Sequence, residues 1–148
     1  MISEIVNYTI KKANSEDIHK HLLACCNNFN PPLNETVELA VYSNKIFEKA
    51  ITFEAWNDSS LIGLLAAYFD DVNKSAFVTN VSILGDKIKS GVASQLIMRL
   101  INYAISVGTA KLFLKVNSRN EPAINLYKKF HFQHINTNGY ELEMELFI

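Results

Sequence analysis

Cysteine is scarce in this sequence, and the two cysteines present, Cys25 and Cys26, are neighbours along the chain. Adjacent cysteines cannot form an ordinary structural disulfide with each other, and no second pair exists to complete a zinc site. We therefore expect two free thiols in a reducing compartment, and neither a disulfide framework nor a bound metal.

Net charge and long apolar runs are also lacking. The 14 Lys and Arg residues nearly balance the 15 Asp and Glu residues, which leaves a net charge of −1. Such a chain has no broad electrostatic attraction to nucleic acid or anionic lipid, although a local basic cluster can still hold a small phosphorylated ligand. Asp, Lys or Asn interrupts every apolar run, and the acidic start of the chain does not resemble a signal peptide. We expect a cytoplasmic protein that handles small molecules, without a nucleic-acid or membrane partner.

The composition is otherwise that of one globular domain over residues 1–148. Apolar residues make up 49% of the chain and charged residues 20%, which is enough apolar material for a real core. No linker, repeat or low-complexity tract divides the chain. The strand signals lie at Ile5–Lys11, Ala50–Trp56, Leu61–Phe69, Ala76–Leu84 and Lys111–Val116, with a terminal hairpin closed by Asn138–Gly139.

Helical periodicity separates these strands at four places. Asn14 is the expected cap of the first helix, whose apolar residues are Ile18, Leu22, Leu23 and Cys26. Asn34 is the expected cap of the second, Glu35–Lys49, with buried candidates Val37, Val41 and Ile46. A long helix is predicted over Gly91–Val107, ended by Gly108, and a short one from Asn120 to Phe130.

The long helix decides how the sheet is connected. A hairpin cannot join Ala76–Leu84 to Lys111–Val116 through an intervening helix, so these strands are predicted to be parallel neighbours. The other connections allow antiparallel pairing. The fold class is therefore α/β (α+β), with a mixed, mostly antiparallel central sheet flanked by helices on both faces.

The segment Asp86–Ser94 joins a strand to the long helix and is a candidate phosphate site. A helix N-terminus offers unpaired amides and a partial positive charge, and Gly91 lets the backbone approach a ligand closely. Lys87 and Lys89 add positive charge at the rim. Strand-loop-helix turns with one glycine are common, however, and the alternative is an ordinary solvated turn.

A second segment runs from Val116 to Phe132. Asn120 caps, Pro122 suits a first helical turn, and Ala123, Leu126, Tyr127 and Phe130 recur at helical intervals. On this pattern alone, a tyrosine is more often a core aromatic than a catalytic residue.

The two segments together resemble the GNAT N-acetyltransferase superfamily. The resemblance is carried by the turn Gly91-Val92-Ala93, a following strand that ends in Asn117, and the pattern Asn-x-x-Ala-x-x-Leu-Tyr from Asn120 to Tyr127. It implies an N-acetyltransferase that moves the acetyl group of acetyl-CoA to a small-molecule primary amine by direct attack through a tetrahedral intermediate. The terminal strand, Tyr140–Ile148, can leave an apolar edge, so a monomer or a homodimer is expected.

The resemblance assigns a role to each matching residue. Tyr127 is expected to protonate the departing CoA thiolate, and Asn120 to contact the cofactor. The strand around Ser82, Ile83 and Leu84 offers main-chain groups to pantetheine. The pyrophosphate is expected to lie against Ile88, Lys89, Ser90, Gly91, Val92, Ala93 and Ser94. Two residues depart from the family pattern: Ile88 stands where Arg or Gln is usual, and His131 stands where Gly is usual.

The general base stays unassigned at this stage. The strand Ala76–Leu84 contains no carboxylate, and Glu54, Asp70 and Asp71 are possible substitutes. The segment Phe29–Leu33 is expected to border the acceptor pocket. A CoA-binding regulatory or scaffold module with weak catalysis is the alternative function, and an unrelated α/β interaction domain is a third.

Overall fold

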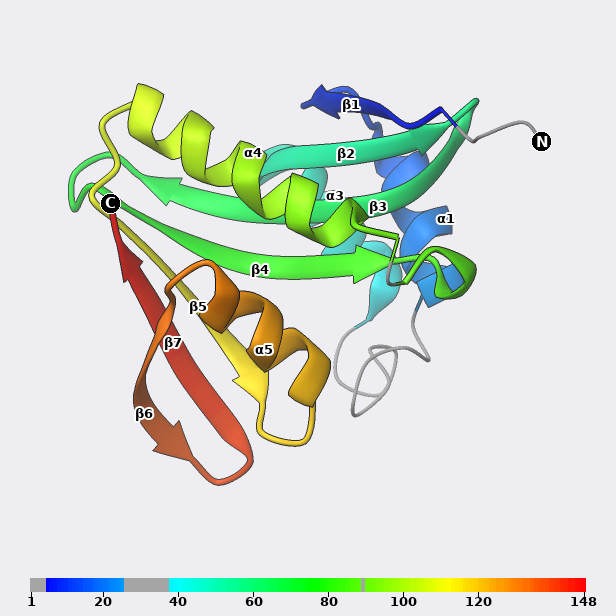
Figure 1. Cartoon of the computed structure of the whole chain (residues 1–148). Coiled ribbons are helices and arrows are strands. Elements are labelled where there is room, and N and C mark those ends of the chain that lie inside the picture. The colour runs from blue at the N-terminus through cyan, green and yellow to red at the C-terminus, as the bar shows by residue number, and fades with distance from the viewer. Residues whose placement is uncertain (1–4, 26–37, 89) are drawn as a thin grey trace.

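The computed structural model describes residues 5–25, 38–88 and 90–148. A seven-stranded sheet in the order β1-β2-β3-β4-β5-β7-β6 forms the centre of the molecule (Figure 1). Its strands are β1 Asn7–Ile10, β2 Ile51–Asn57, β3 Ser60–Asp70, β4 Ser75–Ile83, β5 Lys111–Asn117, β6 Gln133–Asn138 and β7 Glu141–Phe147. Its described α-helices are α1 Ser15–Cys25, α3 Leu39–Lys49, α4 Val92–Ser106 and α5 Glu121–Lys129, and a 3₁₀-helix, η2 Gly85–Lys87, lies between β4 and α4. The predicted order of elements is confirmed.

The pairing of strands also agrees with the prediction. β4 and β5 pair in parallel, and every other neighbouring pair in the sheet is antiparallel. Gly108 and Gly139 adopt positive φ angles of 81° and 63°, the left-handed conformation that the helix end and the hairpin turn require.

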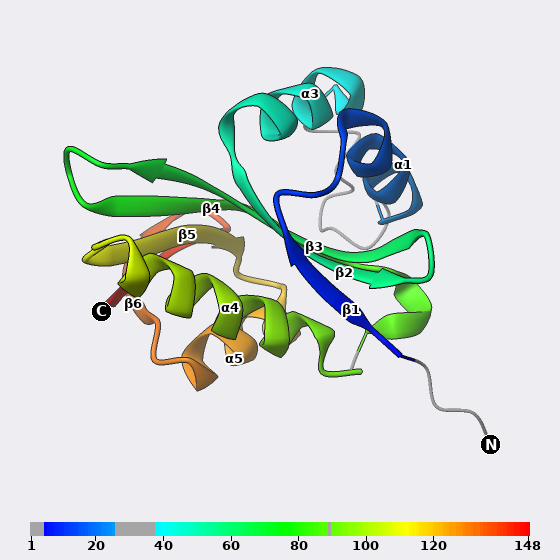
Figure 2. The same cartoon turned by 90° about the horizontal axis from the view of Figure 1, so that it is seen from above.

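Helices cover both faces of the sheet, with α1 and α3 on one face and α4 and α5 on the other (Figure 2). Each face encloses its own apolar cluster. Leu96, Ile97 and Leu100 of α4 pack against strand residues such as Phe53 and Leu65. Ile18 and Leu22 of α1 meet Ile46 of α3 over the opposite face. The sheet is therefore the shared middle layer of the fold.

The buried faces of α1 and α3 differ from the prediction. Val41 of α3 is 67% exposed and Leu23 of α1 is 53% exposed, because other residues of each helix face the core. The buried residues of α3 are Leu39, Ser43 and Ile46. Those of α1 are Ile18, His21, Leu22 and Cys25. Residue 38 is extended, so α3 begins at Leu39 rather than at Glu35. The Glu38 carboxylate caps it by accepting hydrogen bonds from Ala40 N and Val41 N, both at 3.1 Å. Cys26, Asn34 and Val37 lie outside the described residues.

A β-bulge in β4 changes the alternation of its side chains, so that residues after the bulge face the opposite helical layer from the one expected by simple alternation. Ala66 and Ala67 of β3 pair with Asn80 and Val78, so Thr79 is an extra residue in β4. Ala76 and Val78 belong to the core under α4, whereas Asn80 and Ser82 point to the side of α1 and α3. Polar residues of β4 are thereby brought next to the N-terminal helices.

No helix in the described ranges has both the length and the apolar character needed to cross a membrane.

The contact between α4 and β3 predicts the effect of one substitution. A Cβ added at Gly63 would lie 2.8 Å from Val92 Cγ1 and 3.1 Å from Ile83 Cδ1. Gly63→Ala is therefore expected to displace the first turn of α4 and to lower the free energy of unfolding by about 1–3 kcal/mol. Urea denaturation measures this change, and unaltered stability would contradict the close packing.

Candidate functional site

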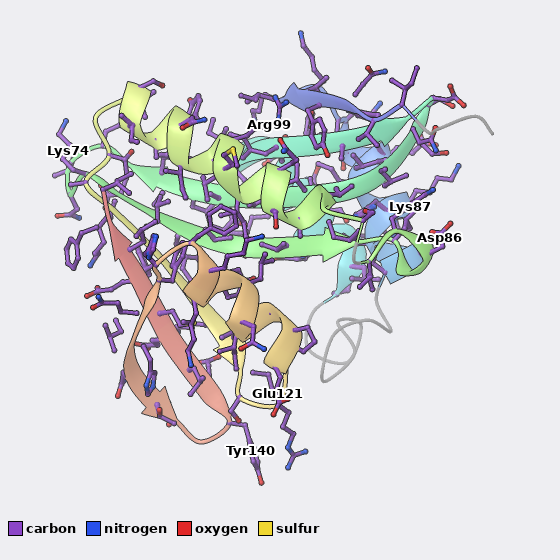
Figure 3. All side chains as sticks on the ribbon, in the orientation of Figure 1. Lys74, Asp86, Lys87, Arg99, Glu121 and Tyr140 are labelled. Atoms are coloured by element: carbon purple, nitrogen blue, oxygen red, sulfur yellow. The ribbon has the colours of Figure 1, made fainter. Side chains whose placement is uncertain are left out.

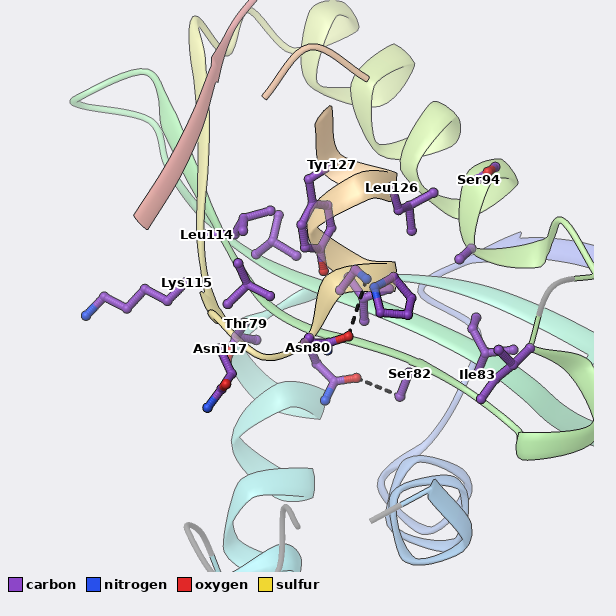
Figure 4. A pocket seen from close by; sticks show the side chains of 18 of the residues that line it. Thr79, Asn80, Ser82, Ile83, Ser94, Leu114, Lys115, Asn117, Leu126 and Tyr127 are labelled. Atoms are coloured by element: carbon purple, nitrogen blue, oxygen red, sulfur yellow. Dashed lines mark hydrogen bonds between the residues drawn. The ribbon is translucent and has the colours of Figure 1, made fainter. Parts of the chain in front are cut away.

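β4 and β5 separate before either strand ends, and a cavity opens between them. Their parallel pairing runs from Ser75 and Lys111 to Val78 and Leu114, whereas β4 continues to Ile83 and β5 to Asn117. The cavity at this point measures about 780 Å³ and is bordered by α4 and α5 as well as by both strands (Figure 4). One space therefore connects the helix N-termini on one face of the sheet with the polar residues of β4.

The N-terminus of α4 opens into this cavity. Gly91 precedes the helix with φ 89°, no side chain caps it, and a Cβ there would meet nothing within 4 Å. The amides of the first turn have no partner within the helix, and its dipole favours an anion. Side chains cap the other described helices: Asn14 for α1, Glu38 for α3 and Asn120 for α5. The end of α4 is thus suited to hold a phosphate group.

Most of the residues that the sequence pointed to are brought together here. The predicted site residues that line the cavity are Ser82, Ile83, Ile88, Gly91, Ala93, Ser94, Asn120 and Tyr127. Lys87 lines it as well, and Figure 3 places Lys87 and Asp86 in the connection between β4 and α4. Lys89 lies outside the described residues.

Three predicted residues do not line the cavity. Leu84 follows the end of β4, and its N–H donates to Ile62 O at 2.9 Å while its carbonyl accepts from Lys87 N. Ser90 N–H donates to Lys87 O at 3.1 Å. Val92 is 3% exposed because its side chain packs into the core at Gly63. The main chain of Leu84 is therefore already hydrogen-bonded within the protein, and Val92 contributes an anchor for α4.

Tyr127 combines a packed ring with a hydroxyl at the cavity. Its side chain is 8% exposed, and its ring lies 5.8 Å from that of Phe132. The hydroxyl is directed from α5 toward β4 (Figure 4). Burial raises the pKa of Tyr127 to about 12, so the phenol stays protonated at neutral pH. It is held as a hydrogen-bond donor at the point where the two strands separate.

Asn120 takes the capping role that its sequence context indicates. Its Oδ1 accepts a hydrogen bond from Ala123 N at 3.3 Å, which begins α5 at Glu121. The same residue borders the cavity. By fixing where α5 begins, the cap also fixes the position of Tyr127 along the cavity wall.

The carboxylates considered as general bases do not reach the cavity. Glu54 is fully buried on β2, where it accepts hydrogen bonds from Thr9 Oγ1, Thr52 Oγ1 and the amides of Lys12 and Ala13. Asp70 holds the β3–β4 turn by accepting hydrogen bonds from Asn73 Nδ2, Asn73 N and Val72 N, and these bonds, the one from the Asn73 side chain first, lower the pKa of its carboxyl. Asp71 is exposed in the same turn. None of the three lines the cavity.

Sequence reasoning missed a polar group behind β4. Asn80 lines the cavity and bonds Ser82, which bonds the buried His21 of α1. The signal was present in the helical spacing of Ile18, His21, Leu22 and Cys25, which places His21 on the buried face. The segment Phe29–Leu33 lies outside the described residues.

The β6–β7 hairpin closes the cavity on the β5 side. Asn138, Tyr140 and Glu141 line it, and Tyr140 lies at the tip of the hairpin near the start of α5 (Figure 3). The Arg119 guanidinium lies 4.2 Å from the centre of the Tyr140 ring, and Lys115 Nζ is 3.9 Å from Glu141 Oε1. These contacts join the rim to β5 and to the loop before α5.

Comparison with known proteins identifies both a family and a fold. Residues 15–132 match the model of the Acetyltransferase (GNAT) family. A search of curated proteins gave no match. Among solved structures, PaiA N-acetyltransferase from Thermoplasma acidophilum in complex with coenzyme A is similar, with 15% identity and a TM-score of 0.77 over 96% of this chain and 99% of that chain.

Two other solved structures share the fold. The ribosomal-protein-S18-alanine N-acetyltransferase from Escherichia coli is 19% identical, with a TM-score of 0.77 over 96% of this chain and 94% of that chain. NAA60 from Arabidopsis thaliana, in complex with a bisubstrate analogue, is 18% identical, with a TM-score of 0.76 over 96% and 98%. At these identities, the likeness establishes the architecture alone.

The surroundings of Glu54 predict a purely structural role. Glu54→Ala removes the acceptor for two backbone amides and two hydroxyls, so it is expected to lower the free energy of unfolding by about 3–5 kcal/mol. Ligand binding by the remaining folded protein is expected to be unchanged, because Glu54 does not line the cavity. Thermal unfolding and a binding isotherm measure the two effects. A binding defect with full stability would contradict this role.

Proposed function

The chain belongs to the GNAT acetyltransferase family, and we propose that it acetylates a primary amine of a small molecule. Acetyl-CoA is the cosubstrate of such an enzyme and supplies the activated acetyl group. The observation that carries the proposal is the single cavity that joins the uncapped end of α4, the Tyr127 hydroxyl and the polar residues of β4.

The residues around the α4 end fit the diphosphate of CoA. The amides of Val92, Ala93 and Ser94 belong to a helical turn without intrahelical acceptors, and the left-handed Gly91 leaves open space beside them. Lys87 adds positive charge at the rim. Ile88 is 47% exposed and supplies an apolar contact in place of a cationic or amide side chain. Main-chain amides therefore carry the recognition of phosphate.

The separated edge of β4 fits the pantetheine arm, in the manner of a peptide added to a sheet edge. Ser82 and Ile83 line the cavity on this side, and Asn120 borders it on the side of α5. Tyr127 is the proton donor for the departing thiolate, because it lines the cavity from α5 and its phenol is protonated at neutral pH.

The depth of the polar end supports a small acceptor. Asn80 is 4% exposed and Ser82 is 5% exposed, so an amine must enter far into the cavity to contact them. Such limited exposure favours a small acceptor. The protein-acetylating enzyme named above shares the fold, so a peptide with a free amino terminus belongs in the test.

The experiment measures release of CoA thiol with acetyl-CoA and a panel of small primary amines, with short peptides as the comparison. Transfer to one or more small amines supports the proposal. Transfer to peptides alone would overturn the assignment of a small-molecule acceptor. Binding of CoA without transfer to any amine would identify a CoA-binding module instead.

Tyr127→Phe tests the proton donor. The ring and its packing remain, so stability and CoA affinity are expected to change little. The turnover number is expected to fall about 10²-fold or more, the usual contribution of a general acid. Steady-state kinetics measures kcat, and calorimetry measures CoA binding. An unchanged kcat would remove Tyr127 from the mechanism.

Ala93→Glu tests the phosphate cradle. A carboxylate in the first turn of α4 favours the helix dipole, so the melting temperature of the free protein is expected to hold or rise. The same charge repels a diphosphate, so the rise in melting temperature on adding CoA is expected to disappear. Gln95→Glu is the matched control, because Gln95 is exposed in the same helix and does not line the cavity. Full stabilisation of Ala93→Glu by CoA would place the diphosphate elsewhere.

A further inference from the structure

A buried histidine connects α1 to the polar end of the cavity. His21 is 3% exposed, its Nδ1 lies 2.7 Å from Leu61 O, and its Nε2 lies 2.9 Å from Ser82 Oγ. Ser82 Oγ lies 2.8 Å from Asn80 Oδ1 (Figure 4). The three side chains form one hydrogen-bonded row that begins inside the protein and ends at the cavity wall.

The proton positions in this row follow from its acceptors. A carbonyl oxygen only accepts, so the contact with Leu61 O requires a proton on Nδ1 of His21. In a neutral imidazole, Nε2 then carries a lone pair. It accepts the single hydroxyl proton of Ser82 once that hydroxyl rotates away from Asn80 Oδ1, to which it donates in the structure. The Ser82 oxygen is left with lone pairs to accept a further hydrogen bond.

A second proton on His21 reverses the direction of the hydrogen bonds in this row. Nε2–H then donates to Ser82 Oγ, with Ser82 O also within 3.2 Å, and the hydroxyl of Ser82 donates to Asn80 Oδ1. The two states differ by one proton on Nε2 and a rotation of one hydroxyl. The geometry holds an acceptor for each state, so a proton can enter at Ser82 and be held at His21.

The row is open toward the cavity. Ser82 and Asn80 both line it, because the extra residue Thr79 turns this part of β4 away from the α4 core. Asn80 Nδ2 is buried and has no hydrogen-bond partner in the described part of the chain. Burial raises the pKa of the neighbouring Tyr42 phenol, and the Asn80 side chain, acting on it as a hydrogen-bonding group, offsets part of that rise. A buried amide beside a cavity, without a well-formed hydrogen bond of its own, can donate to an oxygen or nitrogen of a bound molecule.

We propose that Ser82 is the catalytic residue that accepts the proton of the attacking amine, with His21 as the positioning residue that receives the proton in turn. The inference rests on the proposed acetyl transfer and supplies the base that no carboxylate provides. Asn80 orients the Ser82 hydroxyl and presents its amide to the acceptor.

The proton transfer balances without any further reactant. As the nitrogen bonds to the acetyl carbon, its acidity rises and its N–H bond breaks, with the electron pair staying on nitrogen. That proton passes to Ser82 Oγ while the hydroxyl proton of Ser82 passes to His21 Nε2. The products of this step are a tetrahedral intermediate, with a neutral nitrogen and an oxyanion, and an imidazolium whose Nδ1–H remains bonded to Leu61 O. The oxyanion then re-forms the carbonyl as the C–S bond breaks, and the departing CoA thiolate takes the proton of Tyr127.

The electrostatics around His21 agree with this use. Burial lowers the pKa of His21 from 6.5, and hydrogen bonds to the carbonyls of Leu61 and Ser82 offset part of that change. The imidazole is therefore neutral at pH 7, as a proton acceptor must be. The titratable side chain in contact with it, within the described residues, is the thiol of Cys25, whose Sγ lies 3.6 Å from Nε2. The partners on β3 and β4 are the uncharged Leu61 carbonyl and Ser82.

The experiment compares wild type with Ser82→Ala and His21→Asn. The asparagine amide can still donate to Leu61 O, which preserves the tie between α1 and β3. Each variant is expected to lower kcat about 10²-fold, the usual effect of removing a general base, with acetyl-CoA binding retained. His19→Asn is the control two residues away on α1, because His19 borders a separate shallow groove beside α3. Its kcat is expected to match wild type.

The pH profile separates a proton acceptor from a structural tie. Wild-type kcat at saturating amine is expected to fall as the pH drops below 6.5, because His21 becomes protonated. This acid limb is expected to be absent from Ser82→Ala and His21→Asn. A normal kcat and an unchanged acid limb in Ser82→Ala would overturn the proposal.

Nitrogen chemical shifts of His21 test the row without turnover. The expected neutral form carries its proton on Nδ1, and Ser82→Ala is expected to perturb the Nε2 shift. A neutral form protonated on Nε2 would overturn the proposal. Absence of transfer by wild type to every amine, with CoA bound, is a different result and would instead refute the proposed acetyl transfer.

Discussion

The structure depends on one feature of its sheet: parallel pairing between β4 and β5 stops at Val78 and Leu114 although both strands continue. The parts of β4 and β5 before and after this point contribute differently. Before it, the hydrogen bonds between the two strands and the apolar core under α4 hold the sheet together. On the other, the separated strands border the cavity that reaches both helical layers. The uncapped N-terminus of α4 and the polar row behind β4 border one cavity only because the sheet opens here.

The surrounding elements keep this opening in place. Val92 packs at Gly63 and anchors the first turn of α4. The N-terminus of that helix has no side-chain cap and points to the cavity. Asn120 sets the start of α5 and therefore the height of Tyr127. The buried Glu54 ties β2 to the amides of Lys12 and Ala13 just before α1. Packing and capping position the functional groups, and the cavity provides the space in which they act.

The protonation states of two groups on opposite sides of the cavity, the Tyr127 phenol and the His21 imidazole, bear on its chemistry. Burial keeps the Tyr127 phenol protonated and the His21 imidazole neutral at pH 7, so a donor and an acceptor of protons exist together. In the family to which the chain belongs, acetyl transfer requires a proton to leave the amine and a thiolate to be stabilised. Desolvation raises the pKa of the phenol and lowers that of the imidazole, so each group starts in the protonation state that its task requires.

The sequence by itself determined the order of elements, the parallel β4–β5 pair, the glycine turn before α4 and the place of Tyr127 on α5, because periodicity, glycine and capping residues act over a few neighbouring positions. The tertiary structure decided what depends on contacts distant in sequence. It excluded Glu54 as a base, buried His21 and exposed Val41, and the extra residue Thr79 turned Asn80 and Ser82 toward α1. Such facts depend on strand register and on which helix covers which face, and no local pattern encodes a register set by residues some 60 positions apart, as His21 and Ser82 are.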